Sequence, residues 1–271
     1  MIGEHGVRRH ARLGLEAAVL SAVALLITAP FHGTESGAIA LFLTAAGLSS
    51  RFDSLLHENY RLHGDGARAL DLTVDRRSAS SLLAIFLGVL VAFVVAALLF
   101  GSAGVEGRFG FLLELTVPKE HSIVTQSFGP PLPLIGHNLL VLGSAVILGL
   151  VYRDFGALLV IVWNAASWGL MLTLLVLRAV QTGDHHPAVL VLASFVAVLP
   201  HLVLEALAYV TAGLAAVFGS LLLTNDDIRA LAGRVTRSSA VMLATSIVFL
   251  VAAALLESYW TPLVLDTVRT G

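Results

Sequence analysis

The chain has 271 residues, of which 57% are hydrophobic and only 13% are charged. Soluble domains carry about 25% charged residues, so this composition indicates an integral membrane protein. A formal charge of -2 excludes a general basic surface, and we therefore expect no nucleic-acid partner. The absence of cysteine excludes disulfides, thiolate metal ligands and cysteine nucleophiles.

Apolar runs recur along the whole chain. They reach about 20 residues, the length that crosses a hydrocarbon core of about 30 Å. They predict an all-α fold, a polytopic bundle of about seven transmembrane spans that forms a single integral membrane domain over residues 1–271. The expected spans are 13–29, 37–50, 80–100, 132–151, 155–177, 187–223 and 239–262.

The first two runs predict an N-terminal helical hairpin over residues 13–50. The arginines at 8, 9 and 12 before an apolar stretch resemble a secretory signal, but the stretch resumes at Gly37, so we expect an uncleaved anchor. Arg12 and Glu16 are four residues apart and are expected to pair on one helix.

Two connecting segments and the last span have distinct features. Residues 51–79 predict a cytoplasmic connector in which Phe52, Leu55 and Leu56 recur at helical spacing. Residues 101–132 form an outer segment that fits either an amphipathic segment or a hairpin. The last span, 239–262, ends in Glu257 and an aromatic interfacial belt, so Glu257 is expected to be solvated at the outer surface.

The basic residues predict the orientation, because Lys and Arg near span ends favour the cytoplasm. With the N-terminus inside, twelve of the 16 basic residues fall in inner segments and four in outer segments. The sequence therefore predicts an N-in, C-out multi-pass protein of the cell membrane, with a prokaryotic cytoplasmic membrane as the expected location.

The sixth span is unusually long. Its 37 residues, 187–223, would extend about 55 Å as one straight helix, which exceeds a bilayer. Pro200 removes a backbone hydrogen bond, so we expect a kink or break there and a broken helix that crosses once. A re-entrant hairpin is the alternative, but without a further crossing it would leave the following arginines outside.

Few polar side chains lie deep in the expected spans, and such residues usually face a bundle interior or a wet cavity. His201 and Glu205 share a helix face. In a structural network these two residues would pair, and Asn138 and Asn164 would join neighbouring helices by hydrogen bonds. The expected polar cluster consists of His137, Asn138, Asn164, His201, Glu205 and Tyr209.

The chemistry of this cluster has three readings: a structural network, a transport or proton-linked site, and a catalytic metal site. The metal reading recruits His137, His201 and Glu205, which would leave a fourth tetrahedral position of a zinc ion open for water. The sequence has no His-Glu-x-x-His motif, so no cofactor is evident and zinc is only a possibility.

The order of these features resembles the stage II sporulation protein M family. The resemblance covers residues 132–223, through Gly136-His137-Asn138-Leu139, the Asn164 segment and Pro200-His201-Leu202-Val203-Leu204-Glu205. Family members often have Asn-Asn at the first motif and a glycine where this chain has Leu202.

The resemblance implies a polytopic membrane protein whose embedded His, Glu and Asn residues are family features, without supplying a reaction. Sporulating members act with peptidoglycan-remodelling partners, as anchors or organisers. The expected function is therefore a membrane scaffold or transport component, with an intramembrane metal-dependent hydrolase as the alternative, and an enzyme is the less favoured class. Expected partners are the lipid bilayer and either a membrane or envelope protein or a second copy of the chain.

Overall fold

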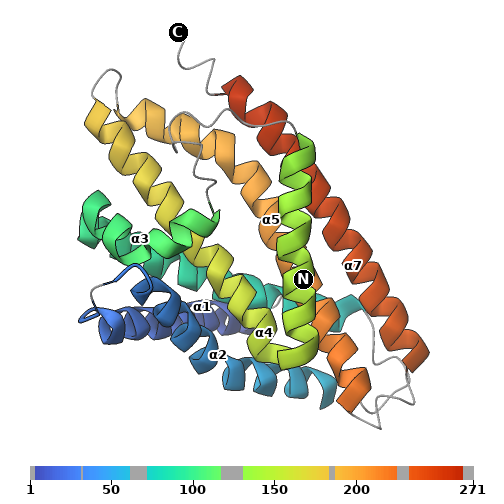
Figure 1. Cartoon of the computed structure of the whole chain (residues 1–271). Helices are drawn as coiled ribbons and strands as arrows, with labels where there is room; N and C mark the ends of the chain where they lie inside the picture. Colours follow the sequence, from blue (N-terminus) through green and yellow to red (C-terminus); the bar gives the residue numbers. More distant parts are fainter. Residues whose placement is uncertain are drawn as a thin grey trace.

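The structure, a computed structural model, describes residues 4–31, 33–61, 72–116, 131–182, 187–224 and 232–264 (Figure 1). Every regular element in these ranges is helical, which confirms the all-α prediction. Within these ranges, six helices are each long and apolar enough to cross a membrane, by length and composition. In chain order the elements are α1 (Glu4–Thr28), α2 (Ser36–Arg61), α3 (Leu72–Thr116), α4 (Pro131–Thr182), α5 (Pro187–Thr224), α7 (Ala232–Leu255) and the π-helical turn η1 (Leu256–Trp260).

Helix α4 consists of two legs joined by a sharp reversal. Arg153 has a φ of 53° and a ψ of -127°, and the chain turns back at this residue so that the legs form a V in Figure 1. A Cβ atom at Gly156 would collide with the carbonyl oxygen of Leu148, so only glycine allows the second leg to start this close to the first. The legs coincide with the expected spans 132–151 and 155–177, and they explain how six helices supply about seven crossings.

Helix α3 also contains a turn. Gly101 has a φ of 68°, a left-handed conformation that glycine adopts without a steric penalty. The rings of Phe93 and Phe109 are 5.8 Å apart, whereas 16 residues of straight helix would separate them by about 24 Å. Residues 102–116 therefore fold back against the first part of α3.

The folded-back segment packs on the turn between α1 and α2. The Arg108 guanidinium donates from Nη1 to the carbonyl oxygen of Ala29 at 2.8 Å, and the Ser36 hydroxyl donates to the carbonyl oxygen of Arg108 at 3.1 Å. Arg108 also lies over the Phe100 ring, 4.8 Å from its centroid. The outer segment expected over 101–132 is thus helical as far as Thr116, and residues 117–130 lie outside the described ranges.

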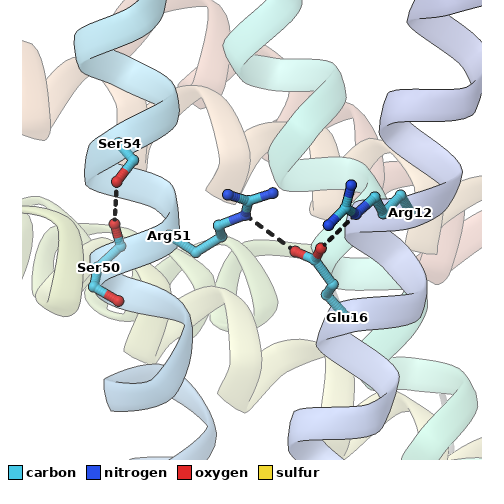
Figure 2. Close-up of polar contacts among 5 residues, drawn as sticks. All are labelled: Arg12, Glu16, Ser50, Arg51 and Ser54. Atoms are coloured by element: carbon cyan, nitrogen blue, oxygen red, sulfur yellow. Dashed lines mark hydrogen bonds and ion pairs between the residues drawn. The ribbon is translucent and has the colours of Figure 1, made fainter.

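Helices α1 and α2 form the predicted N-terminal hairpin. Glu16 of α1 accepts hydrogen bonds from Arg12 Nε at 2.9 Å and from Arg51 Nε of α2 at 3.1 Å (Figure 2). The expected Arg12–Glu16 pair is confirmed, and Arg51 extends it between the helices. Arg51 lies in the second half of α2 and Glu16 at the middle of α1.

The segment expected as a connector, residues 51–79, is largely helical where it is described. Helix α2 continues to Arg61 and α3 begins at Leu72, while residues 62–71 lie outside the described ranges. Phe52, Leu55 and Leu56 are buried, as their helical spacing predicted. Apolar burial against the bundle therefore extends the second helix beyond the expected end of its span.

The charged groups sort to two ends of the N-terminal half. Arg153, in the α4 reversal, lies 4.0 Å from Asp53 of α2, at the same end of the bundle as Arg51 and Glu16. Arg108 lies at the opposite end, on the turn after α1. This arrangement agrees with the side of the membrane that the arginine distribution predicts for each group. The N-in, C-out orientation itself stays a prediction.

The apolar core has two parts. The larger cluster joins α1, α2 and α3 to the second leg of α4, to α5 and to the start of α7, and its largest fully buried side chains include Phe93, Phe109 and Phe218. A smaller cluster joins Leu142 of the first α4 leg to Tyr209 of α5 and Leu250 of α7. Tyr209, one of the polar residues of α5, lies at this second, smaller contact between helices.

Helix α5 keeps its helical backbone through Pro200. Its 38 residues would extend about 57 Å if straight, and Figure 1 shows that the helix bends in its first half. The expected kink at Pro200 therefore takes the form of a bend, and α5 is not divided into two separate helices.

Candidate functional site

The candidate site lies where α5 meets α7 and the second leg of α4. His201, Glu205 and Tyr209 follow one another at four-residue intervals, so their side chains stack on one face of α5. All three are buried, with exposed fractions of 3%, 7% and 2%. Buried polar groups at membrane depth are costly unless they find partners, so the partners of each residue indicate its role.

Glu205 takes its hydrogen bond from Tyr209. The phenolic hydroxyl donates to Glu205 Oε1 at 2.9 Å, one turn further along the same helix. The structural reading had paired Glu205 with His201, one turn earlier. Both spacings allow a contact on a helix face, and the structure shows that the tyrosine is the donor.

His201 is held by an aromatic neighbour instead. Its ring lies 5.7 Å from the ring of Trp168, on the second leg of α4, with the two planes at 58°. The Nδ1 atom of His201 is buried and has no hydrogen-bond partner among the residues that the structure describes. An unpaired buried polar atom is uncommon in folded proteins and marks a place where an additional ligand or proton could be accommodated.

The two asparagines lie on faces that turn toward this site. Asn164 is one turn before Trp168, and its Nδ2 donates to the carbonyl oxygen of Val160 at 2.8 Å, within its own helix. Asn138 is one turn before Leu142, which packs in the same apolar cluster as Tyr209. Both asparagines are buried, each with 8% exposure.

His137 differs from the other predicted residues because its side chain is exposed. In the described part of the chain, no group of three or more His, Asp or Glu side chains lies where it could hold a metal ion. A zinc site formed by His137, His201 and Glu205 stays a prediction. That the remaining five residues act as one functional site stays a prediction.

A second carboxylate adjoins the site. Glu257, in η1, is half-buried and lies three residues before Trp260, whose indole donates to the backbone of α5. Solvation of Glu257 at the outer surface stays a prediction. The π-helical turn that contains it is closed by the Thr261 N–H, which donates to the carbonyl oxygen of Leu256, and such turns frequently occur at functional sites.

The turn η1 and the residue after it also cap the carbonyl groups around Pro200. In a regular helix, the N–H of residue 200 would donate to the carbonyl oxygen of Val196, but proline has no N–H. Trp260 Nε1 donates to this oxygen at 3.1 Å, and the Thr261 hydroxyl donates to the carbonyl oxygen of Ala197 at 3.0 Å. Two side chains from the end of the last span thus join η1 to the bend in α5.

Sequence reasoning missed four contributors to this site: Trp168, Glu257, Trp260 and Thr261. The signal for Glu257 was present, since it is a carboxylate close to the end of an apolar run, but the following aromatic residues made a solvated position the simpler reading. The contacts of Trp168, Trp260 and Thr261 join residues distant in sequence, which spacing along one helix does not predict.

The comparisons with known proteins identify the family. Neither the search of curated proteins nor the search of solved structures found a match. A family model, described as Stage II sporulation protein M, matches residues 120–262, which include α4, α5 and η1. This match covers more than half of the 271 residues and contains the polar residues of α5, so the chain belongs to the Stage II sporulation protein M family.

Proposed function

We propose that this chain is a membrane scaffold, a helical bundle that holds another membrane or envelope protein, or a second copy of itself, at a prokaryotic cytoplasmic membrane. The observation that carries the proposal is the pair of hydrogen bonds that fixes the end of the last span against α5. There Trp260 and Thr261 donate to the backbone of α5 beside Pro200. Polar groups used to fix one helix against another are what a structural network requires.

The pairing of Glu205 supports the same function. Its carboxylate accepts a hydrogen bond from the Tyr209 hydroxyl, which lies on the same helix inside the bundle. A carboxylate held in this way stabilises the local arrangement of α5 and contributes to a fixed surface for a partner. On this proposal, partner binding depends on the shape of the bundle and not on the charge of Glu205.

Glu205→Gln tests the scaffold, because glutamine keeps an acceptor for Tyr209 and removes the charge. The variant and the unmodified chain would be compared in native cells by site-specific cross-linking to neighbouring envelope proteins, with thermal stability measured on the purified protein. The scaffold predicts the same set of cross-linked adducts, with any loss following a loss of stability. Loss of the adducts from a fully stable variant would contradict it.

A transport or proton-linked role is the second proposal, and a specific observation favours it. Glu205 is a buried carboxylate of α5, and Glu257 is a half-buried carboxylate of η1, which contacts α5. One turn before Glu205, the buried Nδ1 of His201 has no hydrogen-bond partner among the described residues. Paired carboxylates and histidines inside membranes are the residues from which proton relays are built. In proteoliposomes, proton movement that is lost in both Glu205→Gln and Glu257→Gln would support this role over the scaffold.

The metal-dependent hydrolase is the remaining alternative. Metal analysis of the purified, unchelated protein separates it from the other two functions. Stoichiometric zinc that is lost on His201→Ala would establish a metal site and favour the hydrolase, whereas cross-linked partners on metal-free protein would favour the scaffold.

A further inference from the structure

The end of the bundle that carries Arg51 contains a hollow outside the site described above. It lies between α1 and α2, has a volume of about 270 Å³, and is lined by four arginines and two leucines. The lining residues are Arg8, Arg9, Arg12, Leu13, Arg51 and Leu55. Both leucines are buried, so the lining of the hollow combines arginine side chains with apolar side chains of the core.

Two of the arginines that line this hollow, Arg12 and Arg51, are held by the same carboxylate, Glu16. Each carboxylate oxygen of Glu16 accepts one hydrogen bond, from Arg12 Nε at 2.9 Å and from Arg51 Nε at 3.1 Å. In Figure 2 the terminal nitrogens of Arg51 point away from Glu16. Planar guanidinium forks held in place suit the bidentate binding of phosphate oxygens.

The hollow continues into an apolar track along α1. At 100° per residue, Arg8, Arg12, Leu15 and Val19 fall within about 60° of the helix circumference. Leu15 and Val19 are 66% and 52% exposed, and Val23, one turn further, is 45% exposed. A basic hollow followed along the same helix face by exposed aliphatic side chains matches a molecule with an anionic head and an apolar tail.

We propose that the hollow lined by Arg8, Arg9, Arg12 and Arg51 binds the phosphate headgroup of an anionic phospholipid, whose acyl chains lie along Leu15, Val19 and Val23 of α1. Basic pockets between membrane helices bind anionic headgroups through the same chemistry. Free phosphate shares the charged group but would leave the apolar track without an occupant. We therefore assign the hollow to a lipid.

Native mass spectrometry of the full-length chain in neutral detergent tests this proposal. Phosphatidylglycerol and phosphatidylcholine with identical acyl chains serve as probes, and we expect the anionic lipid to be retained preferentially. Each basic residue near an anionic lipid surface contributes about fivefold in binding. Arg8→Gln combined with Arg51→Gln is expected to weaken phosphatidylglycerol binding by about 25-fold.

Two further variants control for folding and for general charge. Arg8 is exposed and is not one of the two arginines bonded to Glu16, so Arg8→Gln alone is expected to fold and to lose about fivefold in lipid binding. Arg237, exposed on α7 and not part of the hollow, is the matched control, and Arg237→Gln should leave lipid retention unchanged.

Three results would overturn the proposal: equal retention of the two lipids, undiminished phosphatidylglycerol binding in the folded Arg8→Gln protein, or an equal loss in Arg237→Gln. Inorganic phosphate distinguishes the source of the anion. If millimolar phosphate binds the detergent-purified chain and both lipids are retained equally, the hollow is a site for soluble phosphate and the lipid assignment is wrong.

Discussion

Trp260 Nε1 donates a hydrogen bond to the carbonyl oxygen of Val196, the acceptor that Pro200 leaves without its regular helical donor. Trp260 and Val196 are 64 positions apart in the chain. A proline inside a membrane helix is tolerated when neighbouring groups satisfy the backbone that it frees. Here the neighbour is the turn at the end of the last span, so the bend in α5 and the position of η1 depend on each other.

This relationship predicts coupling between Trp260 and Pro200. In the unmodified chain, Trp260→Phe leaves the Val196 oxygen unpaired. In a Pro200→Ala background, the restored N–H can satisfy that oxygen. We expect Trp260→Phe to cost about 0.5–1 kcal/mol more in the unmodified chain than in the Pro200→Ala background, in line with hydrogen bonds inside membranes. Unfolding titrations in mixed micelles measure all four free energies.

Thr261→Val supplies the control for this cycle. Its acceptor, the carbonyl oxygen of Ala197, keeps the N–H of residue 201 as its regular helical partner in both backgrounds. The cost of Thr261→Val should therefore be the same with proline or alanine at position 200. An equal cost of Trp260→Phe in both backgrounds would show that the indole does not compensate for the proline.

The second prediction concerns Glu205 and Tyr209. Tyr209→Phe removes the donor of a buried pair, whereas Glu205→Gln keeps an acceptor for the tyrosine. We expect Glu205→Gln to cost about 1 kcal/mol or less and Tyr209→Phe to cost more, because the phenylalanine variant leaves a buried carboxylate without its donor. Unfolding free energies of the two variants decide the order, and the reverse order would mean that the charge of Glu205 has another buried partner.

The third prediction concerns the reversal in α4. Arg153 has a positive φ of 53°, a conformation that costs a non-glycine residue about 1–3 kcal/mol. Arg153→Gly should therefore be more stable than Arg153→Ala by about 1 kcal/mol. Both variants lose the 4.0 Å contact with Asp53, so the comparison isolates the backbone. Equal stability in an unfolding titration would show that the backbone at this position is not strained.

The fourth prediction is the orientation. The chain has no cysteine, so single cysteines can be introduced without removing others. A cysteine at Thr270 should react with an impermeant thiol reagent added outside intact cells, and one at Thr236, which is exposed on α7, should not. Detergent-permeabilised cells, in which both positions should react, provide the control. In intact cells, labelling of the cysteine at position 236 but not of the one at position 270 would contradict the predicted topology.

Local patterns predicted the local features of the fold. Apolar runs of membrane-spanning length located the helices, and the four-residue spacing of Arg12 and Glu16 predicted an ion pair that the structure confirms. The arginine between the fourth and fifth runs separated two spans, which the structure shows as two legs of α4. These features follow from helix geometry and the cost of charge in lipid, both of which operate over a few residues.

The features that could not be predicted depend on contacts between distant segments. Pro200 indicated a break, but the side chains that satisfy its neighbours come from residues 260 and 261. Glu205 has neighbours at equal spacing on its helix face, His201 and Tyr209. The sequence analysis paired it with the histidine, whereas in the structure the tyrosine is the donor and the histidine ring packs against Trp168. Helical spacing identifies a shared face, but it does not specify which neighbour from another helix covers it.

The contact of Arg108 with the turn after α1 has a consequence for the order of assembly. Helices α1 and α2 are synthesised before residues 102–116, so their hairpin first enters the membrane without the guanidinium that binds Ala29 or the carbonyl group that accepts from Ser36. The turn completes these hydrogen bonds only when α3 has been made and its last segment has folded back at Gly101. Maturation of the N-terminal hairpin therefore follows insertion of the third helix during biogenesis.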